Sequence, residues 1–509
     1  MEKADWTALK PQVITDAYGE NLRLLRLSAH AEENEDVVLR EFQAFGRKAA
    51  LLYVDGLADR DCLQRFLLEP LMNASPPAEK DFGEEYLRSS VLPLSSLTPT
   101  SSLETLLQRV FSGDAALILD GMTGALIADM KGFVKSGLHE PLTETVTAGP
   151  HEGFTESLRD NTVLIRRLMR TPALISEPVT VGTKIPSRLC LMYLNGIAKA
   201  ENVEELRQRI RGCEIDYVSS IGVLEQLLED EPRSLLPQMA ATERPDRAVG
   251  FLNEGQIVIV MENAPQVLAL PIGLAHLVHA PDDTAMRWQY GSFLRCLRII
   301  GMVVSMLLPA VFIAVTMFHP EGMSLSLLTS VVESQARVPL SLFSSMLLML
   351  LIFCLINEAS ARIPGIMGAS LSIVGGLILG QAVVEADLFS PLILIVVALS
   401  GLGSYTAPTY PLTLSLRLSQ FLLLIAAGIG GYPLLLVALF FLLLRLFSQT
   451  SLNQPYLAPY APKRPRNPDG LLRLPIWRQR LRGAAANPFF MDRVLGPMRK
   501  WDRQPKEKP

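Results

Sequence analysis

The sequence predicts an α+β membrane protein, in which a duplicated soluble α/β module precedes a polytopic helical membrane domain and a basic tail. Three observations lead to this prediction. Residues 1–290 have the composition of a soluble protein, whereas residues 299–447 contain several long apolar runs and raise the mean hydropathy to +0.28. The soluble half repeats one pattern at a spacing of about 140 residues. From Ser448 onward the chain carries 13 Lys and Arg against 4 Asp and Glu.

Length and cysteine usage limit the class of protein. A chain of 509 residues is too long for one compact domain and suggests about three. The start, MEKADWTALKPQ, has no basic region followed by an apolar stretch, so we expect no cleavable signal peptide. The five cysteines are scattered and contain no CxxC pair, which argues against a disulfide framework and fits a reducing compartment.

The soluble half contains an internal repeat. Residues 1–36 are predicted to be a mobile or helical lead-in. After them, LLYVDGLAD (51–59) is matched by LMYLNGIAK (191–199), each a strand pattern stopped by Asp-Gly or Asn-Gly. Residues 113–126 and 255–268 each read as a strand, a tight turn and a return strand. The offsets of 140 and 142 residues predict a duplication, and chance similarity is the alternative.

This repeat divides the soluble half into two α/β units, residues 37–147 and residues 149–283. Helices are predicted at residues 61–72, with a break at Pro70, and at residues 203–211. Residues 284–447 would then form the membrane domain, and residues 448–509 the basic tail.

Enzyme and cofactor motifs are missing from the sequence. No G-x-G-x-x-G follows either repeated strand, and no G-x-x-x-x-G-K-[ST] occurs, so the sequence contains no recognisable phosphate-binding loop. His151-Glu152 starts like H-E-x-x-H but is followed by Thr155 in place of the second histidine. His276 and His279 have no further ligand type on the same turn. We therefore expect no enzyme activity, no metal or other cofactor and no nucleic-acid partner.

A basic helix is predicted between the two units, in residues 149–172. Thr155 can cap it, and its apolar face is formed by Leu158, Ile165 and Leu168. Arg166, Arg167 and Arg170 lie largely off that face. Two interpretations are open: a connecting helix with a solvated basic side, or an inter-subunit helix whose arginines meet an acidic surface of a neighbouring subunit or partner.

The membrane domain contains several candidate spans. Arginines precede the first run and the tail is basic, so both chain ends of the domain are predicted on the cytoplasmic side and the number of crossings is even, four or six. The last run is interrupted by Gly428, Gly430, Gly431 and Pro433, which predicts a hairpin or re-entrant turn. The apolar runs are residues 299–318, 339–357, 365–384, 391–402 and 418–444.

The third run, continued to residue 385, combines a polar stripe with small residues. Its pore-lining candidates, spaced by four and three on one stripe, are Ser370, Val374, Ile378 and Gln381. Glu385 continues the stripe, either as a residue at the pore mouth or as one at the membrane interface. Gly376 and Gly380 form a G-x-x-x-G on another side, which predicts helix packing.

Seven segments in this sequence resemble one protein family. They are GPHEGFTE (149–156), LIRRLMRTP (164–172), YLNGIA (193–198), TERPDR (242–247), SFLRCLR (292–298), NEASARIPGIMGASLSIVGGLILGQAVVEA (357–386) and PYLAPYAP (455–462). As an ordered set they resemble the A subunit of the GerA-type spore germination receptor family. Two places depart from the family pattern: MENAP (261–265) stands where V-D-G-S-P is usual, and residues 339–357 are more uniformly apolar.

The resemblance implies a multi-pass protein of the spore inner membrane that acts in the response to nutrient germinants. It implies three kinds of protein partner, namely further copies of the chain, a transporter-like B subunit and a lipoprotein C subunit. The family's A subunit is thought to oligomerise around a cation-conducting pore, which makes a ligand-gated cation channel the expected function. The sporulation protein SpoVAF belongs to the same family, so a SpoVAF-like channel and a non-conducting scaffold or transporter accessory are the alternatives.

Overall fold

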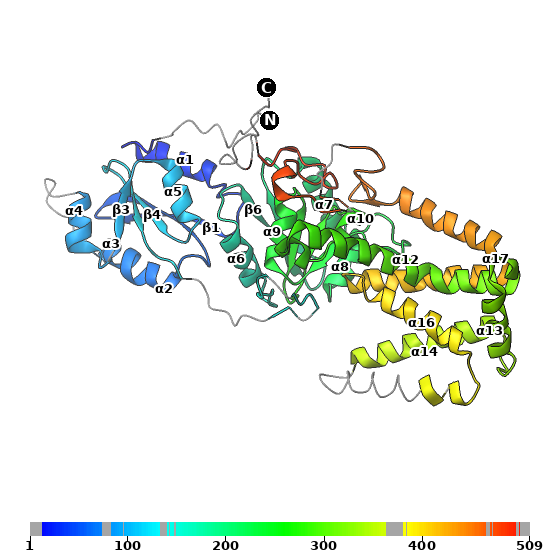
Figure 1. Cartoon of the computed structure of the whole chain (residues 1–509). Helices are drawn as coiled ribbons and strands as arrows, with labels where there is room; N and C mark the ends of the chain where they lie inside the picture. Colours follow the sequence, from blue (N-terminus) through cyan, green and yellow to red (C-terminus); the bar gives the residue numbers. More distant parts are fainter. Residues whose placement is uncertain are drawn as a thin grey trace, which may run out of the picture.

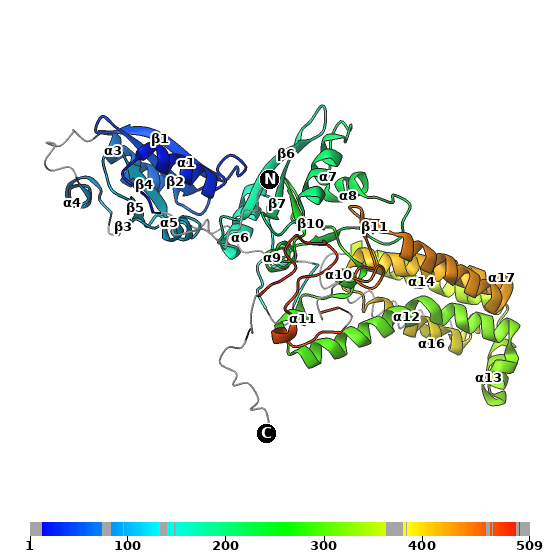
Figure 2. The same ribbon diagram turned by 90° about the horizontal axis from the view of Figure 1, so that it is seen from above.

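The molecule is elongated, with two α+β units in succession and long helices extending from the second unit (Figures 1 and 2). The first unit lies at one end and the apolar helices at the other, so the second unit lies between them. The computed structural model describes residues 13–73, 83–94, 96–132, 140–141, 143–146, 149–362, 380–382, 384–464, 469–470, 472–494 and 498.

The first unit is an antiparallel five-stranded sheet in the order β1-β2-β4-β5-β3, with helices on both faces. Inward side chains alternate along the strands, so that Leu117 faces one core and Ile118 the other. Its elements are α1 (Tyr18–Ser28), β1 (Val37–Ala44), β2 (Arg47–Val54), α2 (Arg60–Leu63), η1 (Gln64–Leu68), α3 (Glu69–Asn73), α4 (Glu84–Tyr86), η2 (Leu87–Val91), β3 (Leu97–Thr100), α5 (Leu103–Val110), β4 (Ala115–Leu119) and β5 (Ala125–Ala128).

The second unit repeats this arrangement, with the strand order β6-β7-β9-β10-β8. Both predicted hairpins, β4–β5 and β9–β10, are present, and the predicted duplication is confirmed. The elements are α6 (Leu158–Leu168), β6 (Leu174–Val181), β7 (Ser187–Leu194), α7 (Ala200–Arg211), α8 (Ile221–Leu228), β8 (Ala240–Thr242), α9 (Pro245–Asn253), β9 (Ile257–Met261) and β10 (Val267–Leu270), followed by α10 (Leu274–Val278) and α11 (Asp282–Ala285).

A buried asparagine fixes the entry to each unit in the same way. The side-chain amide of Asn21 accepts a hydrogen bond from the backbone N–H of Thr15 at 3.0 Å and donates one to the backbone carbonyl of Thr15 at 2.7 Å. The amide of Asn161 makes the same two bonds to Thr155, at 2.7 and 2.6 Å. The two asparagines are 140 residues apart, which extends the repeat to a segment where we predicted only a lead-in.

Helix α1 agrees with the helical alternative for the predicted lead-in, and its Leu25 belongs to the core of the first unit. Three other local predictions need correction. The chain stays helical through Pro70, because the π-helical turn η1 before it moves the carbonyl that a proline ring would strike. Helix α6 is capped by Ser157, whose hydroxyl accepts from Asp160 N, and not by Thr155. Leu168, predicted on the apolar face of this helix, is 47% exposed.

Helix α6 also joins the two units. The Arg166 guanidinium is fully buried, donates to both oxygens of Asp36 at 2.8 Å and lies over the Phe111 ring. It donates further to the Leu174 carbonyl and to Asn34. Since Asp36 and Phe111 lie in the first unit, this arginine bridges the units of one chain.

The membrane domain begins with α12 (Trp288–Phe318). Within the described residues, this helix, α14 (Leu342–Arg362) and α17 (Tyr410–Ser448) are long and apolar enough to cross a membrane. The other elements are η3 (Pro320–Gly322), α13 (Leu325–Gln335) and the shorter apolar α16 (Pro391–Ser404). Large apolar side chains such as Leu355 and Leu402 are two-thirds exposed, as lipid-facing positions require.

Helix α17 is a hairpin rather than one span, as the glycine pattern predicted. Gly430 and Gly431 leave helical geometry, with Gly431 at φ 58° and ψ −145°. A Cβ there would lie 2.8 Å from Phe318, so only glycine fits this turn. The two arms return to the second unit, where Ser415 donates to the Leu235 carbonyl and Gln449 to the Leu236 carbonyl.

Small and polar residues hold the described membrane helices together. A Cβ on Gly403 of α16 would lie 2.4 Å from the Gly301 carbonyl of α12, so the two backbones touch. The buried Ser400 hydroxyl of α16 donates to the Ser305 carbonyl at 2.9 Å and accepts from Gln420 of α17. These contacts connect α12, α16 and α17 without an exposed polar group.

The C-terminal tail folds onto the second unit. The buried Tyr456 hydroxyl donates to the Pro237 carbonyl at 2.7 Å, and Asn202 donates to the Ala486 carbonyl at 3.1 Å. The described elements of the tail are β11 (Thr450–Ser451), β12 (Gln454–Pro455) and η4 (Ile476–Arg478). Much of the basic tail is therefore part of the folded body.

We predict that Arg166→Met loosens the contact between the two units. The change leaves the carboxylate of Asp36 largely buried without a counter-charge, which costs about 3 kcal/mol. Hydrogen exchange on the full chain in detergent should show faster exchange in α6 and β6. Arg170→Met, at an exposed position of the same segment, is the control and should stay within about 0.5 kcal/mol. Equal exchange in the two variants would contradict the bridging role.

Candidate functional site

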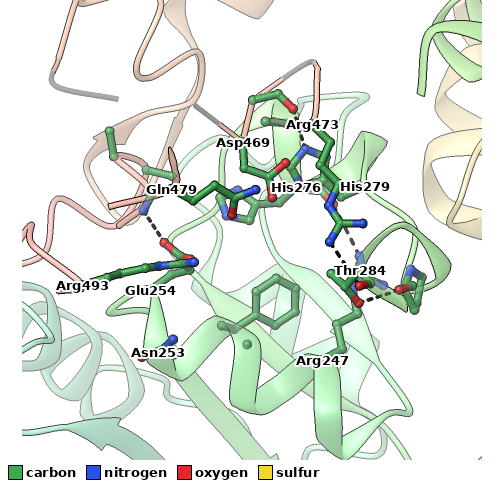
Figure 3. A pocket seen from close by; sticks show the side chains of 18 of the residues that line it. Arg247, Asn253, Glu254, His276, His279, Thr284, Asp469, Arg473, Gln479 and Arg493 are labelled. Atoms are coloured by element: carbon green, nitrogen blue, oxygen red, sulfur yellow. Dashed lines mark hydrogen bonds and ion pairs between the residues drawn. The ribbon is translucent and has the colours of Figure 1, made fainter. Parts of the chain in front are cut away.

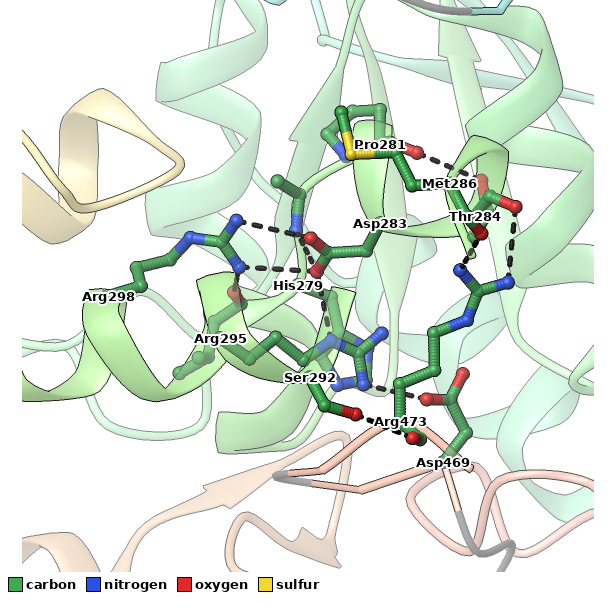
Figure 4. Close-up of polar contacts among 12 residues, drawn as sticks. His279, Pro281, Asp283, Thr284, Met286, Ser292, Arg295, Arg298, Asp469 and Arg473 are labelled. Atoms are coloured by element: carbon green, nitrogen blue, oxygen red, sulfur yellow. Dashed lines mark hydrogen bonds and ion pairs between the residues drawn. The ribbon is translucent and has the colours of Figure 1, made fainter. Parts of the chain in front are cut away.

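The strongest candidate site lies where the second unit, the start of α12 and the tail meet. At its centre is Asp283 of α11, whose side chain is fully buried. Its Oδ2 accepts from Arg295 Nε at 2.9 Å and from Arg298 Nη1 at 3.2 Å, and its Oδ1 accepts from Arg298 Nη2 at 3.2 Å (Figure 4). The spacing of three residues places both arginines on one face of α12. This face is turned toward the soluble unit.

The tail completes this network. Arg295 Nη1 donates to Asp469 Oδ1 at 2.6 Å and to the Gly470 carbonyl at 3.0 Å. Arg473 donates to the carbonyls of Met286 and Thr284, at 2.9 and 3.1 Å (Figure 4). These contacts thus fasten two segments to the start of α12: α11, which directly precedes it, and the tail, which is more than 170 residues away in the sequence.

Burial and pairing shift the pKa values of these groups in opposite directions. Burial by itself raises the pKa of Asp283, but the hydrogen bonds and charges of Arg298 and Arg295 outweigh it, and the pKa is lowered. Burial lowers the pKa of Arg473. Removing one partner of such a network leaves a buried charge uncompensated, which is far more costly than the net stability the network provides.

A cavity of about 320 Å³ lies next to the network, between α9, α10 and the tail (Figure 3). Arg247 lies over the Phe251 ring and pairs with Glu144, while Arg493 pairs with Glu254. The lining is therefore polar, but most of its charges already have partners.

Two histidines form one wall of the cavity. His276 Nδ1 accepts from the Gly273 N–H, and His279 Nε2 lies 2.8 Å from the Gly470 carbonyl, to which it can donate. Burial, with neighbouring positive charge, lowers the pKa of both histidines to about 3. Both are neutral at pH 7. Within the described residues no cluster of three or more His, Cys, Asp or Glu side chains could hold a metal ion.

Most predicted pore residues lie outside the described residues, namely Ser370, Val374 and Ile378, together with Gly376 of the predicted packing face. Gln381 and Glu385 are described, and both are exposed. A Cβ on Gly380 would meet no atom of the described residues within 4 Å, so among these residues no neighbour packs there. The pore-lining, pore-mouth and packing roles stay predictions.

The structure places the three arginines of the predicted basic helix in different settings. Arg166 is buried and paired with Asp36 inside the chain, so it is not available to another subunit. Arg167 pairs with Glu152, and only Arg170, just after the helix, is exposed. A contact with a neighbouring subunit is therefore limited to Arg170 and the accessible part of Arg167.

The sequence reasoning did not identify the Asp283 network. From the sequence, Arg295 and Arg298 were interpreted only as positive charges that set the orientation of the first membrane span. Their spacing of three on an otherwise apolar helix was the available signal, since two arginines on one face need a buried or aqueous partner. Asp469 offered no signal, because it lies 174 residues from Arg295.

A model of the family described as Bacillus/Clostridium GerA spore germination protein matches residues 26–485. The chain belongs to the GerA family. Spore germination protein KA of Bacillus subtilis is 31% identical over 472 residues, covering 92% of this chain and 86% of the relative. Spore germination protein B1 of the same organism is 34% identical, covering 84% of this chain and 88% of the relative. Membership in a family of germination proteins agrees with the expectation that the chain is not an enzyme.

Two further similarities extend the comparison. YfkQ, an uncharacterized membrane protein of Bacillus subtilis, is 33% identical, covering 90% of this chain and 88% of the relative. The crystal structure of the N-terminal domain of the A subunit of the Bacillus megaterium spore germinant receptor GerK3 is 28% identical. That domain matches with a TM-score of 0.40, over 52% of this chain and 97% of that chain.

We predict that acidification loosens the junction. The unfolded chain binds protons on His276 and His279 near pH 6.5, whereas the folded chain binds them only near pH 3. Stability therefore falls as pH drops from 6.5 toward 3, by roughly 2 kcal/mol per histidine at pH 5. The lowered pKa of Asp283 contributes stability that is fully present above the unfolded value of 3.8 and is lost as pH falls through the folded pKa, so it does not add to the change between pH 7 and pH 5.

The measurement is the thermal unfolding of the full chain between pH 7 and pH 5. His276→Gln should remove about half of the pH dependence. His151→Gln, at an exposed position, should leave it unchanged. If His276→Gln follows the wild-type curve, the folded histidine is not held neutral.

We predict that Asp283→Asn detaches the start of α12 from the second unit. The amide keeps the size of the side chain but removes the charge that compensates Arg298, at a cost of about 3 kcal/mol. Hydrogen exchange should rise over residues 280–300. Glu201→Gln changes an ion pair whose glutamate is 79% exposed, so it should have an effect below about 0.5 kcal/mol.

Proposed function

We propose that this chain is the A subunit of a nutrient-germinant receptor in the inner membrane of bacterial spores, and that its copies assemble around a ligand-gated cation channel. The observation that carries the proposal is the Asp283 network. It fastens a large soluble module to the first membrane helix through buried charges. A protein that only anchored a soluble domain would not need so rigid a connection.

Family membership supports the germination role. The relatives KA and B1 are spore germination proteins, and each matches this chain over more than four-fifths of both lengths. We infer from the family resemblance that a transporter-like B subunit and a lipoprotein C subunit are the partners. The small-molecule pocket for the nutrient would then lie in the B subunit. We place the soluble module and the tail on the cytoplasmic side, because the arginines before α12 and the basic tail follow the positive-inside pattern.

The channel part of the proposal rests on the segment 365–385. Gln381 and Glu385 are exposed in the single chain, so their polar groups are open to water or to another copy. In helices α16 and α17, by contrast, Ser400 and Gln420 are buried and hydrogen-bonded within the chain. A ring of copies would bring the polar stripes of residues 365–385 together around a common axis.

A non-conducting family member is the second candidate, and the similarity to YfkQ favours it. This relative is an uncharacterized membrane protein, yet it is as similar to this chain as KA is. A SpoVAF-like channel or a scaffold for other subunits would share the same fold. Ion flux through liposomes that contain the purified chain separates conducting from non-conducting members.

We predict that Ile378→Gly makes the channel leak. A smaller side chain at a pore-lining position widens the passage, so spores should release cations and germinate without nutrient. The readout is cation release from dormant spores carrying the variant. Ile395→Gly on α16, a 54% exposed lipid-facing position, is the control and should leave dormancy intact. Dormant spores with a normal nutrient response in both variants would exclude the pore assignment.

A further inference from the structure

An apolar groove of about 450 Å³ opens between α12, the two arms of the α17 hairpin and residues 231–236 of the second unit. Its walls include Met302 and Met306 of α12, Leu416 of the first arm, and Leu439 and Leu443 of the second. The volume is in the range of protein sites that bind small molecules. The groove is distinct from the polar cavity at the Asp283 network.

Hydrogen bonds of the second unit hold the groove open. Ser415 of the first arm donates to the Leu235 carbonyl, and Gln449 after the second arm donates to the Leu236 carbonyl at 3.1 Å. The loop of residues 231–236 is thus hydrogen-bonded to both arms of the hairpin. At the other end the arms close on α12, where Ala314, Ala427 and Leu435 are buried together.

The surroundings of the groove suggest an apolar occupant. It lies along helices with the length and composition of membrane spans, and its outer side chains remain accessible, with Leu443 43% exposed. In a bilayer, acyl chains are the apolar groups that reach such a surface. Water would gain no hydrogen bonds from the Leu and Met side chains of the walls.

The end of the groove beside the soluble unit is positively charged. Arg233 on the loop and Arg445 in the last turns of α17 both line it, and both are exposed. Within the described residues, neither arginine forms an ion pair with a carboxylate, and Glu231 is the single acidic side chain of the lining. An apolar groove that ends at two arginines beside a membrane surface matches an amphiphile with an anionic head.

We propose that one anionic phospholipid occupies this groove. Its acyl chain lies between α12 and the α17 arms, and its phosphate lies against Arg233 and Arg445. Because Arg233 belongs to the second unit and Arg445 to the membrane domain, the headgroup ties the two together at a second place besides the Asp283 network. The proposal requires only that the chain sits in a membrane, so it stands whether or not the chain conducts ions.

Native mass spectrometry of the detergent-purified full chain tests the headgroup. After incubation with phosphatidylglycerol or phosphatidylcholine, the wild type should retain phosphatidylglycerol in preference. Arg233→Gln combined with Arg445→Gln should weaken this retention by about 30-fold. Arg337→Gln, an exposed arginine outside the groove, should leave it unchanged. An unchanged preference in the double variant, or equal retention of both lipids by the wild type, would overturn the proposal.

A matched pair of leucines tests the acyl site. Leu443 lines the groove, whereas its neighbour Leu444 is similarly exposed at 51% but does not line it. Leu443→Trp should abolish lipid retention, and Leu444→Trp should keep it. If Leu443→Trp keeps the lipid but separates copies of the chain, the groove is a subunit interface and the lipid proposal is wrong.

Discussion

The buried carboxylate of Asp283 is the constraint on which the arrangement of this molecule depends. It lies against two arginines of α12, and one of these arginines also holds Asp469 of the tail. Each charge is costly to bury alone, so the three segments keep their places relative to one another or expose the network to water. The value of such a network lies in fixing one arrangement rather than in adding net stability.

The second unit connects the first unit to the membrane helices. On one side Arg166 joins it to the first unit, and on the other its core includes Met302 of α12 and Leu412 of α17. The α17 hairpin returns to the same unit at Leu235 and Leu236. A displacement of this unit would therefore be transmitted to both the first and the last membrane helices. This is the connection that a receptor subunit with a soluble module would need.

Parts of the fold were predictable because they are local. The repeat at offsets of 140 and 142 residues follows from strand and turn patterns, and the identical strand order of the two sheets confirms it. The reversal at Gly430 and Gly431 was readable because glycine is needed where the backbone leaves helical geometry. For the lead-in the sequence left a mobile and a helical segment open, and the packing of Leu25 of helix α1 into the core of the first unit decides for the helix there.

The sequence alone determined the class of protein, the duplicated unit, the membrane helices and, through seven ordered segments, the family. Only the tertiary structure decided which charges are buried. Arg166, which the sequence allowed on a subunit surface, meets Asp36 inside the chain, and Arg295 meets Asp469 across 174 residues. Periodicity reports which face of a helix is apolar, but the partner of a charge depends on how distant segments pack. Coulomb attraction and desolvation act through space, so no local pattern encodes them.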